Sequence, residues 1–228
     1  MPTADRRAFI PRAIARFLAQ DYLERELLVV DDGTDRVADL IPDDPRVRYI
    51  ALDKRMLLGA KRNLACEEAR GDVIVHWDDD DWSASWRLRY QVEEIVAAGA
   101  DVAGLDRVLF QDVAGNDAWE YEYPRTAAPW VYGATLIYTK AFWRRNPFPP
   151  VNVGEDSRFV WAHLPKRIVA HQDRRFFVGT VHPTNTSRKD TRGHRWRRYS
   201  TDALRSLIRN DGRGESCGGR SRATPILL

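Results

Sequence analysis

Two short apolar runs in this chain end in clusters of aspartate, and this pattern limits the folds open to it. The first reads ELLVVDDGT and places Asp31 and Asp32 after the apolar residues. The second reads DVIVHWDDDD and places Asp78 to Asp81 there. Short continuous apolar runs are typical of strands buried on both faces, as in parallel sheets. Ligands of such sheets bind outside the carboxyl ends of the strands, so we expect a site among these acids.

Helical patterns alternate with the strands. The sequence predicts helices over 8–20, 59–71 and 83–100, and a further strand over 47–52. Ser83 is a plausible N-cap for the third helix. The alternation predicts an α/β fold, in which helices flank a mostly parallel sheet. From Asp101 onward, short aromatic-rich runs separated by Pro, Gly and Asn predict a more mixed or antiparallel half.

The length and composition favour one globular domain with tails. The chain has 228 residues, of which 43% are hydrophobic and 30% are charged. It contains no uninterrupted apolar stretch of roughly 18 to 20 residues, and the N-terminal sequence MPTADRRAF lacks the apolar core of a signal peptide. We therefore expect a cytoplasmic protein. Cys66 and Cys217 are not spaced as metal ligands.

Positive charge is concentrated near the C-terminus. The net charge is +3, but from Ser187 onward there are 11 Lys and Arg against 4 Asp and Glu, so the preceding body is net negative. We expect residues 190–228 to form a basic tail that is partly disordered. A basic tail can attract nucleic acid or an anionic membrane, but a solvated or disordered end is the commoner explanation of such charge. We expect no nucleic-acid partner and at most peripheral membrane contact through the tail.

The run of four aspartates has two interpretations. Hard cations such as Mg²⁺ and Mn²⁺ bind carboxylate oxygens, and Mg²⁺ usually takes one or two carboxylates plus substrate phosphates. The alternative is a solvated acidic turn. Trp77 and Trp82 bracket the run and make a position far out in solvent difficult, which favours a cation site.

Four other motifs are ambiguous when each is taken alone. The two acids in VVDDGT either accept hydrogen bonds from a nucleoside or stabilise a local turn. LGAKRN (58–63) either binds a diphosphate at the start of a helix or is part of a charged surface helix. Glu155 and Asp156 in NVGEDSRF suit a general base or the favourable first turn of a helix. His182, at the end of an apolar run, suits a metal ligand or a structural role.

The order of these motifs is more specific than any one of them. The chain resembles glycosyltransferase family 2, which has the GT-A fold, in the order of five motifs: VVDDG, GAKRN, the DDDD run, an aromatic strand with Gly133, and GED. The resemblance covers residues 1–189, which it implies are one GT-A domain with a nucleotide-binding sheet and a mixed acceptor-side half. It also implies that the first strand of the family is missing, because the chain begins at the loop that should follow it.

The resemblance implies an inverting, metal-dependent transfer of a sugar from a nucleoside-diphosphate sugar to an acceptor hydroxyl. It implies donor contacts at Asp31, Asp32, Lys61, Arg62, Asn63 and Asp79. It implies a D-x-D motif that holds Mn²⁺ or Mg²⁺ at Asp78 and Asp80, with His182 as a looser match. It implies that Asp156 deprotonates the acceptor, with Glu155 beside it.

Two other functional classes stay open at this stage. One is a nucleotidyltransferase that uses the same acids, metal and phosphates, and the other is a non-catalytic sugar- or nucleic-acid-binding protein. The sequence identifies neither the donor sugar nor the acceptor, which is a glycan, a lipid or a protein. Six aromatic residues either stack on an acceptor sugar or form core: Trp119, Tyr121, Tyr123, Trp130, Tyr132 and Trp143.

Overall fold

The computed structural model describes residues 1–112, 114–124 and 128–212. Its first half contains β1 (Pro2–Thr3), α1 (Ile10–Leu18), β2 (Leu27–Asp31), η1 (Ala38–Leu40), β3 (Val47–Ala51), α2 (Leu58–Glu68), β4 (Val73–Val75), β5 (Trp82–Ser83) and α3 (Arg87–Ala98). Its second half contains β6 (Val102–Gly104), β7 (Arg107–Asp112), β8 (Ala118–Glu122), η2 (Gly133–Thr135), β9 (Ile137–Thr139), α4 (Lys140–Arg145), α5 (Glu155–Val160), β10 (Ile168–Ala170), β11 (Phe177–Val181), β12 (Trp196–Arg198) and α6 (Thr201–Arg209).

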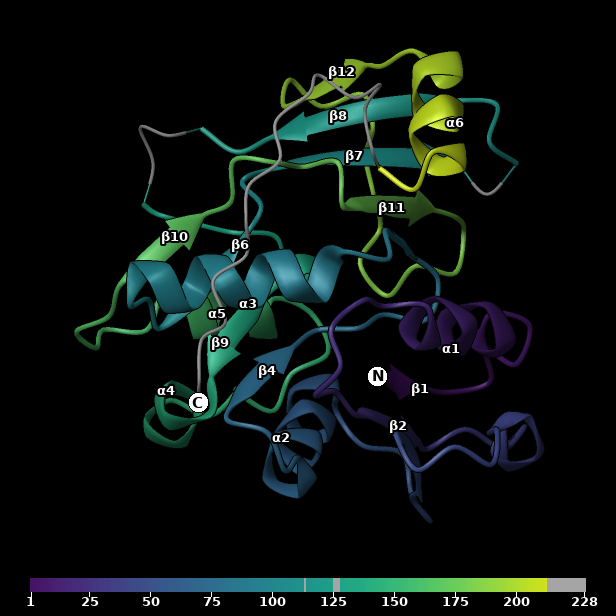
Figure 1. Cartoon of the computed structure of the whole chain (residues 1–228), viewed down its shortest axis with the longest axis vertical. Coiled ribbons are helices and arrows are strands. Elements are labelled where there is room, and N and C mark those ends of the chain that lie inside the picture. Colours follow the sequence, from purple (N-terminus) through teal and green to yellow (C-terminus); the bar gives the residue numbers. More distant parts are fainter. Residues whose placement is uncertain (113, 125–127, 213–228) are drawn as a thin grey trace.

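Three sheets follow one another along the molecule (Figure 1). The first has the order β1-β2-β3 and is parallel throughout. The second has the order β10-β6-β9-β4, in which β9 runs antiparallel to both of its neighbours. The third has the order β12-β8-β7-β11-β5 and is also mixed. The α/β fold with a parallel first part and a mixed second half is therefore confirmed.

The local sequence explains the elements that the pattern predicted. Every residue of β2 is buried, as expected for a strand covered on both faces. Helix α1 begins with a proline in its first turn, where the missing N–H costs nothing, and buries one apolar face: Ile10, Ala13, Ile14 and Phe17. Helix α3 ends at Gly99, which adopts the left-handed conformation with φ of +55°.

One expectation about the elements was wrong. Ser83 does not cap α3, because Trp82 and Ser83 form β5 and pair with β11, and α3 begins only at Arg87. Within the predicted tail, β12 pairs with β8 and α6 packs Leu204 into the core. The rest of that tail, residues 213–228, lies outside the described residues.

Strand β1 is short and lies at one side of the first sheet. Pro2 and Thr3 pair in parallel with β2, and the Met1 amino group extends this ladder by donating to Leu28 O at 2.7 Å. An apolar groove of about 360 Å³ lies between this ladder and β4, lined among others by Leu28 and Ile74.

No helix in the described ranges is both long enough and apolar enough to cross a bilayer.

His171 is a buried histidine that should make stability depend on pH. It is 2% exposed, packs against Tyr90 and Phe176, and neither ring nitrogen has a hydrogen-bond partner among the described residues. Burial, with a smaller contribution from Arg87, lowers its pKa from 6.5 to about 4. The unfolded chain therefore binds more protons than the folded one between these values, and stability should fall as the pH falls through this window.

Replacing this imidazole should remove part of the acid destabilisation. Between pH 7 and pH 4.5, we expect the unfolding free energy of His171→Leu to fall by about 2 kcal/mol less than that of the wild type. Urea denaturation at the two pH values measures this difference. An acid slope equal to that of the wild type would show that His171 is not responsible.

Candidate active site

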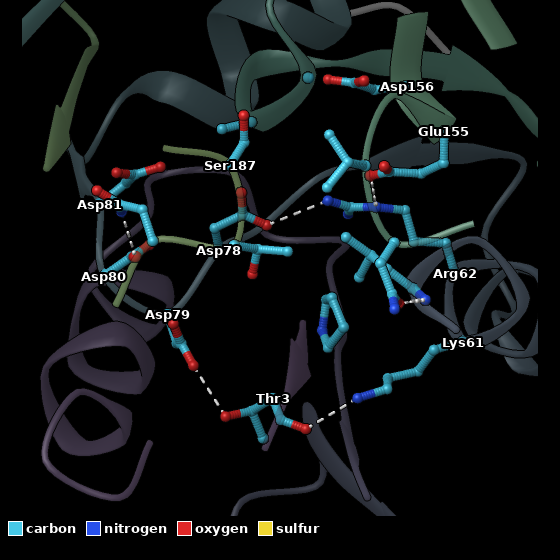
Figure 2. Close-up of a pocket in the computed structure, with 18 of the residues that line it drawn as sticks. Thr3, Lys61, Arg62, Asp78, Asp79, Asp80, Asp81, Glu155, Asp156 and Ser187 are labelled. Atoms are coloured by element: carbon cyan, nitrogen blue, oxygen red, sulfur yellow. Dashed lines mark hydrogen bonds and ion pairs between the residues drawn. The ribbon is translucent and has the colours of Figure 1, made fainter. Parts of the chain in front are cut away.

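A cavity of about 660 Å³ lies beside the ends of β1 and β4 and contains most of the predicted site residues. Its walls come from the loop after β1, the start of α2, the loop after β4, η2, the start of α5 and the segment after β11. This volume is within the range of small-molecule sites. Figure 2 shows the four aspartates, Arg62, Glu155 and Asp156 around it.

The four consecutive aspartates have different surroundings. The Asp78 side chain is 26% exposed, lines the cavity and lies 3.6 Å from the Arg62 guanidinium. Asp81 is half-buried and also lines the cavity, and it accepts a hydrogen bond from Thr180 N at 2.8 Å. Desolvation raises the pKa of its carboxyl well above the usual value. Asp81 therefore ties the loop to β11 through this hydrogen bond.

Asp79 connects the acidic loop to the end of β1. It accepts a hydrogen bond from the Thr3 hydroxyl at 2.8 Å and pairs with Arg6 Nε at 2.9 Å. Burial raises its pKa to about 7, although the positive charge of Arg6 acts in the opposite direction. Both of its side-chain oxygens are thus occupied by the protein.

Asp80 and His182 are brought together, as the sequence predicted. His182 Nε2 lies 2.8 Å from Asp80 Oδ2, and the imidazole stacks on Phe9 with ring centroids 5.3 Å apart. Arg6 pairs with the same Asp80 oxygen. Arg6 was not among the residues predicted from the sequence. The feature that could have indicated it is the basic pair Arg6 and Arg7, which follows the end of β1.

The donor set at this loop suits a hard divalent cation in part. Asp78 and Asp80 are oxygen donors that line the cavity, and His182 is a nitrogen donor of the kind that Mn²⁺ accepts. The described part of the chain has no group of three or more His, Cys, Asp or Glu placed to hold an ion. A cation here would therefore have one or two carboxylates and depend on substrate phosphates, which is how Mg²⁺ commonly binds.

The two acids after β2 have separate roles. Asp31 closes its own loop by accepting from Gly33 N at 2.8 Å, Val37 N at 3.1 Å and the Tyr49 hydroxyl at 2.8 Å. Asp32 forms a buried ion pair with Lys61. Neither aspartate lines the cavity, whereas Lys61 does. The Asp31 carboxylate is thus bound within its own loop.

Arg62 links the two acidic groups of the cavity. Its Nε donates to Glu155 Oε1 at 3.2 Å, and its NH2 lies 3.6 Å from Asp78 Oδ1 (Figure 2). Burial raises the pKa of Glu155, and Arg62 lowers it in part. Asn63, by contrast, points away from the cavity and binds the Trp143 indole and the backbone of Phe148, each at 2.9 Å. The structure therefore does not place Asn63 at the predicted site.

Asp156 faces the cavity from the start of α5, close to the backbone of Gly133. A Cβ atom at Gly133 would lie 2.0 Å from Asp156 Oδ2, so a larger residue there would force the Asp156 carboxylate to move. Asp156 Oδ1 accepts from Ser157 N at 2.7 Å, and His76 Nδ1 lies 2.7 Å from Gly133 O, which fixes η2 from behind. The arrangement leaves Asp156 beside an open cavity with no ion-pair partner among the described residues.

Comparisons with known proteins identify the family to which the chain is similar. The family model described as Glycosyl transferase family 2 matches residues 1–151. The succinoglycan biosynthesis protein ExoO of Rhizobium meliloti (strain 1021) is 44% identical over 98 residues, which are 41% of this chain and 28% of that protein. The putative colanic acid biosynthesis glycosyl transferase WcaA of Escherichia coli (strain K12) is 38% identical over 86 residues, 36% of this chain and 31% of that protein. The chain thus spans under a third of the length of these two relatives.

Solved structures share the fold. S. aureus TarS 1-349 in complex with UDP-GlcNAc matches with a TM-score of 0.66 and 20% identity, over 92% of this chain and 63% of that one. The mannosyltransferase PcManGT from Pyrobaculum calidifontis, in complex with GDP-Man and Mn²⁺, matches with a TM-score of 0.64 and 19% identity, over 81% of this chain and 56% of that one. Together with the match over residues 1–151, these likenesses lead to one conclusion: the chain belongs to glycosyltransferase family 2 and has its GT-A fold.

Proposed function

We propose that the cavity binds a nucleoside-diphosphate sugar and transfers its sugar to an acceptor hydroxyl with inversion at the anomeric carbon. The observation that carries this proposal is that one cavity collects Asp78, Asp80 and Asp156 from different elements, with Lys61 and Arg62 beside them. Neighbours of the same fold are bound to UDP-GlcNAc or GDP-Man, which supports a donor of this class.

Mn²⁺ or Mg²⁺ is the cation we propose for the donor. Asp78 and Asp80 would hold it, with His182 beside Asp80, and the GT-A neighbour bound to Mn²⁺ supports this assignment. When bound, such a cation offsets negative charge on the leaving diphosphate. Lys61 and Arg62 add positive charge on the same side of the cavity, where it favours an anionic ligand.

Asp156 is the general base in this proposal. Its carboxylate would accept the proton of the acceptor hydroxyl while that oxygen attacks the anomeric carbon from the face opposite the diphosphate, which inverts the centre. Glu155 has a different task, because its carboxylate holds Arg62. The cytoplasmic location, the absence of a nucleic-acid partner and peripheral membrane contact through the tail stay predictions.

Gly133 should be required for the position of the base. We expect Gly133→Ala to lower kcat by about 10²-fold, because the added methyl group would displace Asp156, and a shift of about 1 Å at a reacting group has effects of this size. Gly71→Ala is a matched control, since its nearest contact would be an ordinary 3.6 Å to Val73 O. Steady-state kinetics of both variants, with their melting temperatures, measure the difference. Wild-type kcat in Gly133→Ala would contradict the placement.

A thermal-shift screen tests the proposed function. We expect one or more sugar nucleotides, or the matching nucleoside diphosphate, to raise the melting temperature in the presence of Mn²⁺, and to do so less without it. If no sugar nucleotide stabilises the protein and Mn²⁺ changes nothing, the proposed function fails.

A further inference from the structure

A group of aromatic rings lies at the side of the cavity that carries Asp156. Trp130 and Tyr132 both line the cavity, together with Gly133, Asp156 and Ser157. Both rings are half-buried rather than enclosed. Trp119, by contrast, is 8% exposed and belongs to the core. Trp143 is half-buried too, but it does not line the cavity. Trp130 and Tyr132 therefore remain accessible to a molecule that enters the cavity.

The Trp130 ring is held in a fixed orientation. Its Nε1 donates to Ser157 Oγ at 3.1 Å, which ties it to the residue next to Asp156. Tyr123 packs against it with centroids 4.8 Å apart and planes 30° apart, and Tyr121 and Tyr132 meet it at steeper angles of 67° and 61°. A rigid indole beside the proposed base is a preorganised surface, which lowers the entropic cost of binding.

Cationic donors flank these rings. Lys189 Nζ lies 5.1 Å from the centre of the Tyr132 ring and lines the cavity, and the Arg195 guanidinium carbon lies 5.1 Å from that of Tyr123. Neither cation has an ion-pair partner in the described ranges. A pyranose ring presents an apolar C–H face that packs on an aromatic ring, and hydroxyl groups at its edge that accept hydrogen bonds from such cations.

We propose that Trp130 and Tyr132 form an acceptor subsite for a saccharide, whose ring stacks on Trp130 and thereby brings one hydroxyl to Asp156. This inference rests on the proposed glycosyl transfer and specifies its acceptor as a glycan rather than a protein side chain or a lipid phosphate. Lys189 donates to hydroxyls of the stacked sugar. The subsite is separate from the donor side, where Lys61, Arg62 and Asp78 lie.

The test compares donor and acceptor binding in the same variants. The probes are glucose-, galactose- and N-acetylglucosamine-based trisaccharides, and binding is read by saturation transfer from protein aromatic protons and by titration. We expect at least one trisaccharide to bind the wild type. Its affinity for Trp130→Ala should be about tenfold lower, whereas its affinity for Trp130→Phe, which keeps an aromatic face, should be nearly unchanged. Trp143→Phe is the control, because Trp143 is also half-buried but does not line the cavity, and its indole binds Asn63 instead.

Donor binding distinguishes a failure of the saccharide subsite from a failure of the proposed transferase function. All variants should bind the sugar nucleotide as the wild type does, and melting temperatures exclude misfolding. If the donor binds but no trisaccharide does, or if Trp130→Ala binds the trisaccharide as well as the wild type, the subsite is wrong while the transferase proposal stands. If Lys189→Gln abolishes binding of a soluble prenyl phosphate and Trp130→Ala has no effect on it, the acceptor is a lipid phosphate and the saccharide inference is overturned.

Discussion

Asp156→Asn is expected to lower kcat for sugar transfer by about 10²- to 10⁴-fold, the usual contribution of a general base. The amide keeps the shape of the side chain and its oxygen still accepts from Ser157 N, so the local structure should persist. It cannot take up the acceptor proton. Because Asp156 lies on the acceptor side, donor affinity should stay close to that of the wild type.

Kinetics with saturating donor measure this loss, and a parallel donor titration shows that binding survives. Asp117→Asn is the matched control, because Asp117 is 50% exposed and lies outside the cavity. A kcat for Asp156→Asn within about tenfold of the wild type would remove Asp156 from the role of base.

Lys61→Met is expected to lower the free energy of unfolding by about 3 to 5 kcal/mol, as for other broken buried ion pairs. The Lys61 and Asp32 side chains are 6% and 1% exposed, so removal of the cation leaves a buried carboxylate with little solvent. Met56 N, at 2.8 Å, and Arg55, at 3.6 Å, remain near Asp32 but compensate only in part.

A double-mutant cycle checks the cause of this loss. Adding Asp32→Leu to Lys61→Met removes the unpaired charge, so the double variant should be more stable than Lys61→Met alone. Urea denaturation of the four proteins measures the coupling. If the two single effects simply add, Lys61 and Asp32 are not an energetic pair.

Local sequence patterns were sufficient where a segment's periodicity matches its burial. The helix at 10–18 and the strand at 27–31 follow this rule. The helix at 58–68 was also predicted, although it buries Lys61 and Arg62 rather than an apolar stripe, and the predicted strands at 47–51 and 73–75 are only partly buried. The pattern failed at Ser83, because pairing with β11 converts a good N-cap into a strand residue. Within the predicted tail, Leu204, Leu207 and Ile208 have the spacing of an amphipathic helix and follow Ser200, which caps α6.

The site was predictable in residue types but not in all of its contacts. The acids after β2 and β4 were visible, yet local turn geometry decides that Asp31 faces its own loop. Arg6 contacts Asp79 and Asp80 because the loops after β1 and β4, which belong to different sheets, line the same cavity. A short sequence motif does not contain this information. Asn63 was assigned from its position in GAKRN, but its helix face points to Trp143 and Phe148.

The most direct measurement is a calorimetric titration of UDP and GDP into the protein with and without Mn²⁺. The same titration is made with a variant that carries both Asp78→Asn and Asp80→Asn. We predict that one nucleotide binds the wild type, that Mn²⁺ strengthens this binding, and that the double variant loses the Mn²⁺-dependent part. Equal binding by the wild type and the double variant, or no binding of either nucleotide, would contradict the assignment of this cavity to a nucleotide-sugar donor.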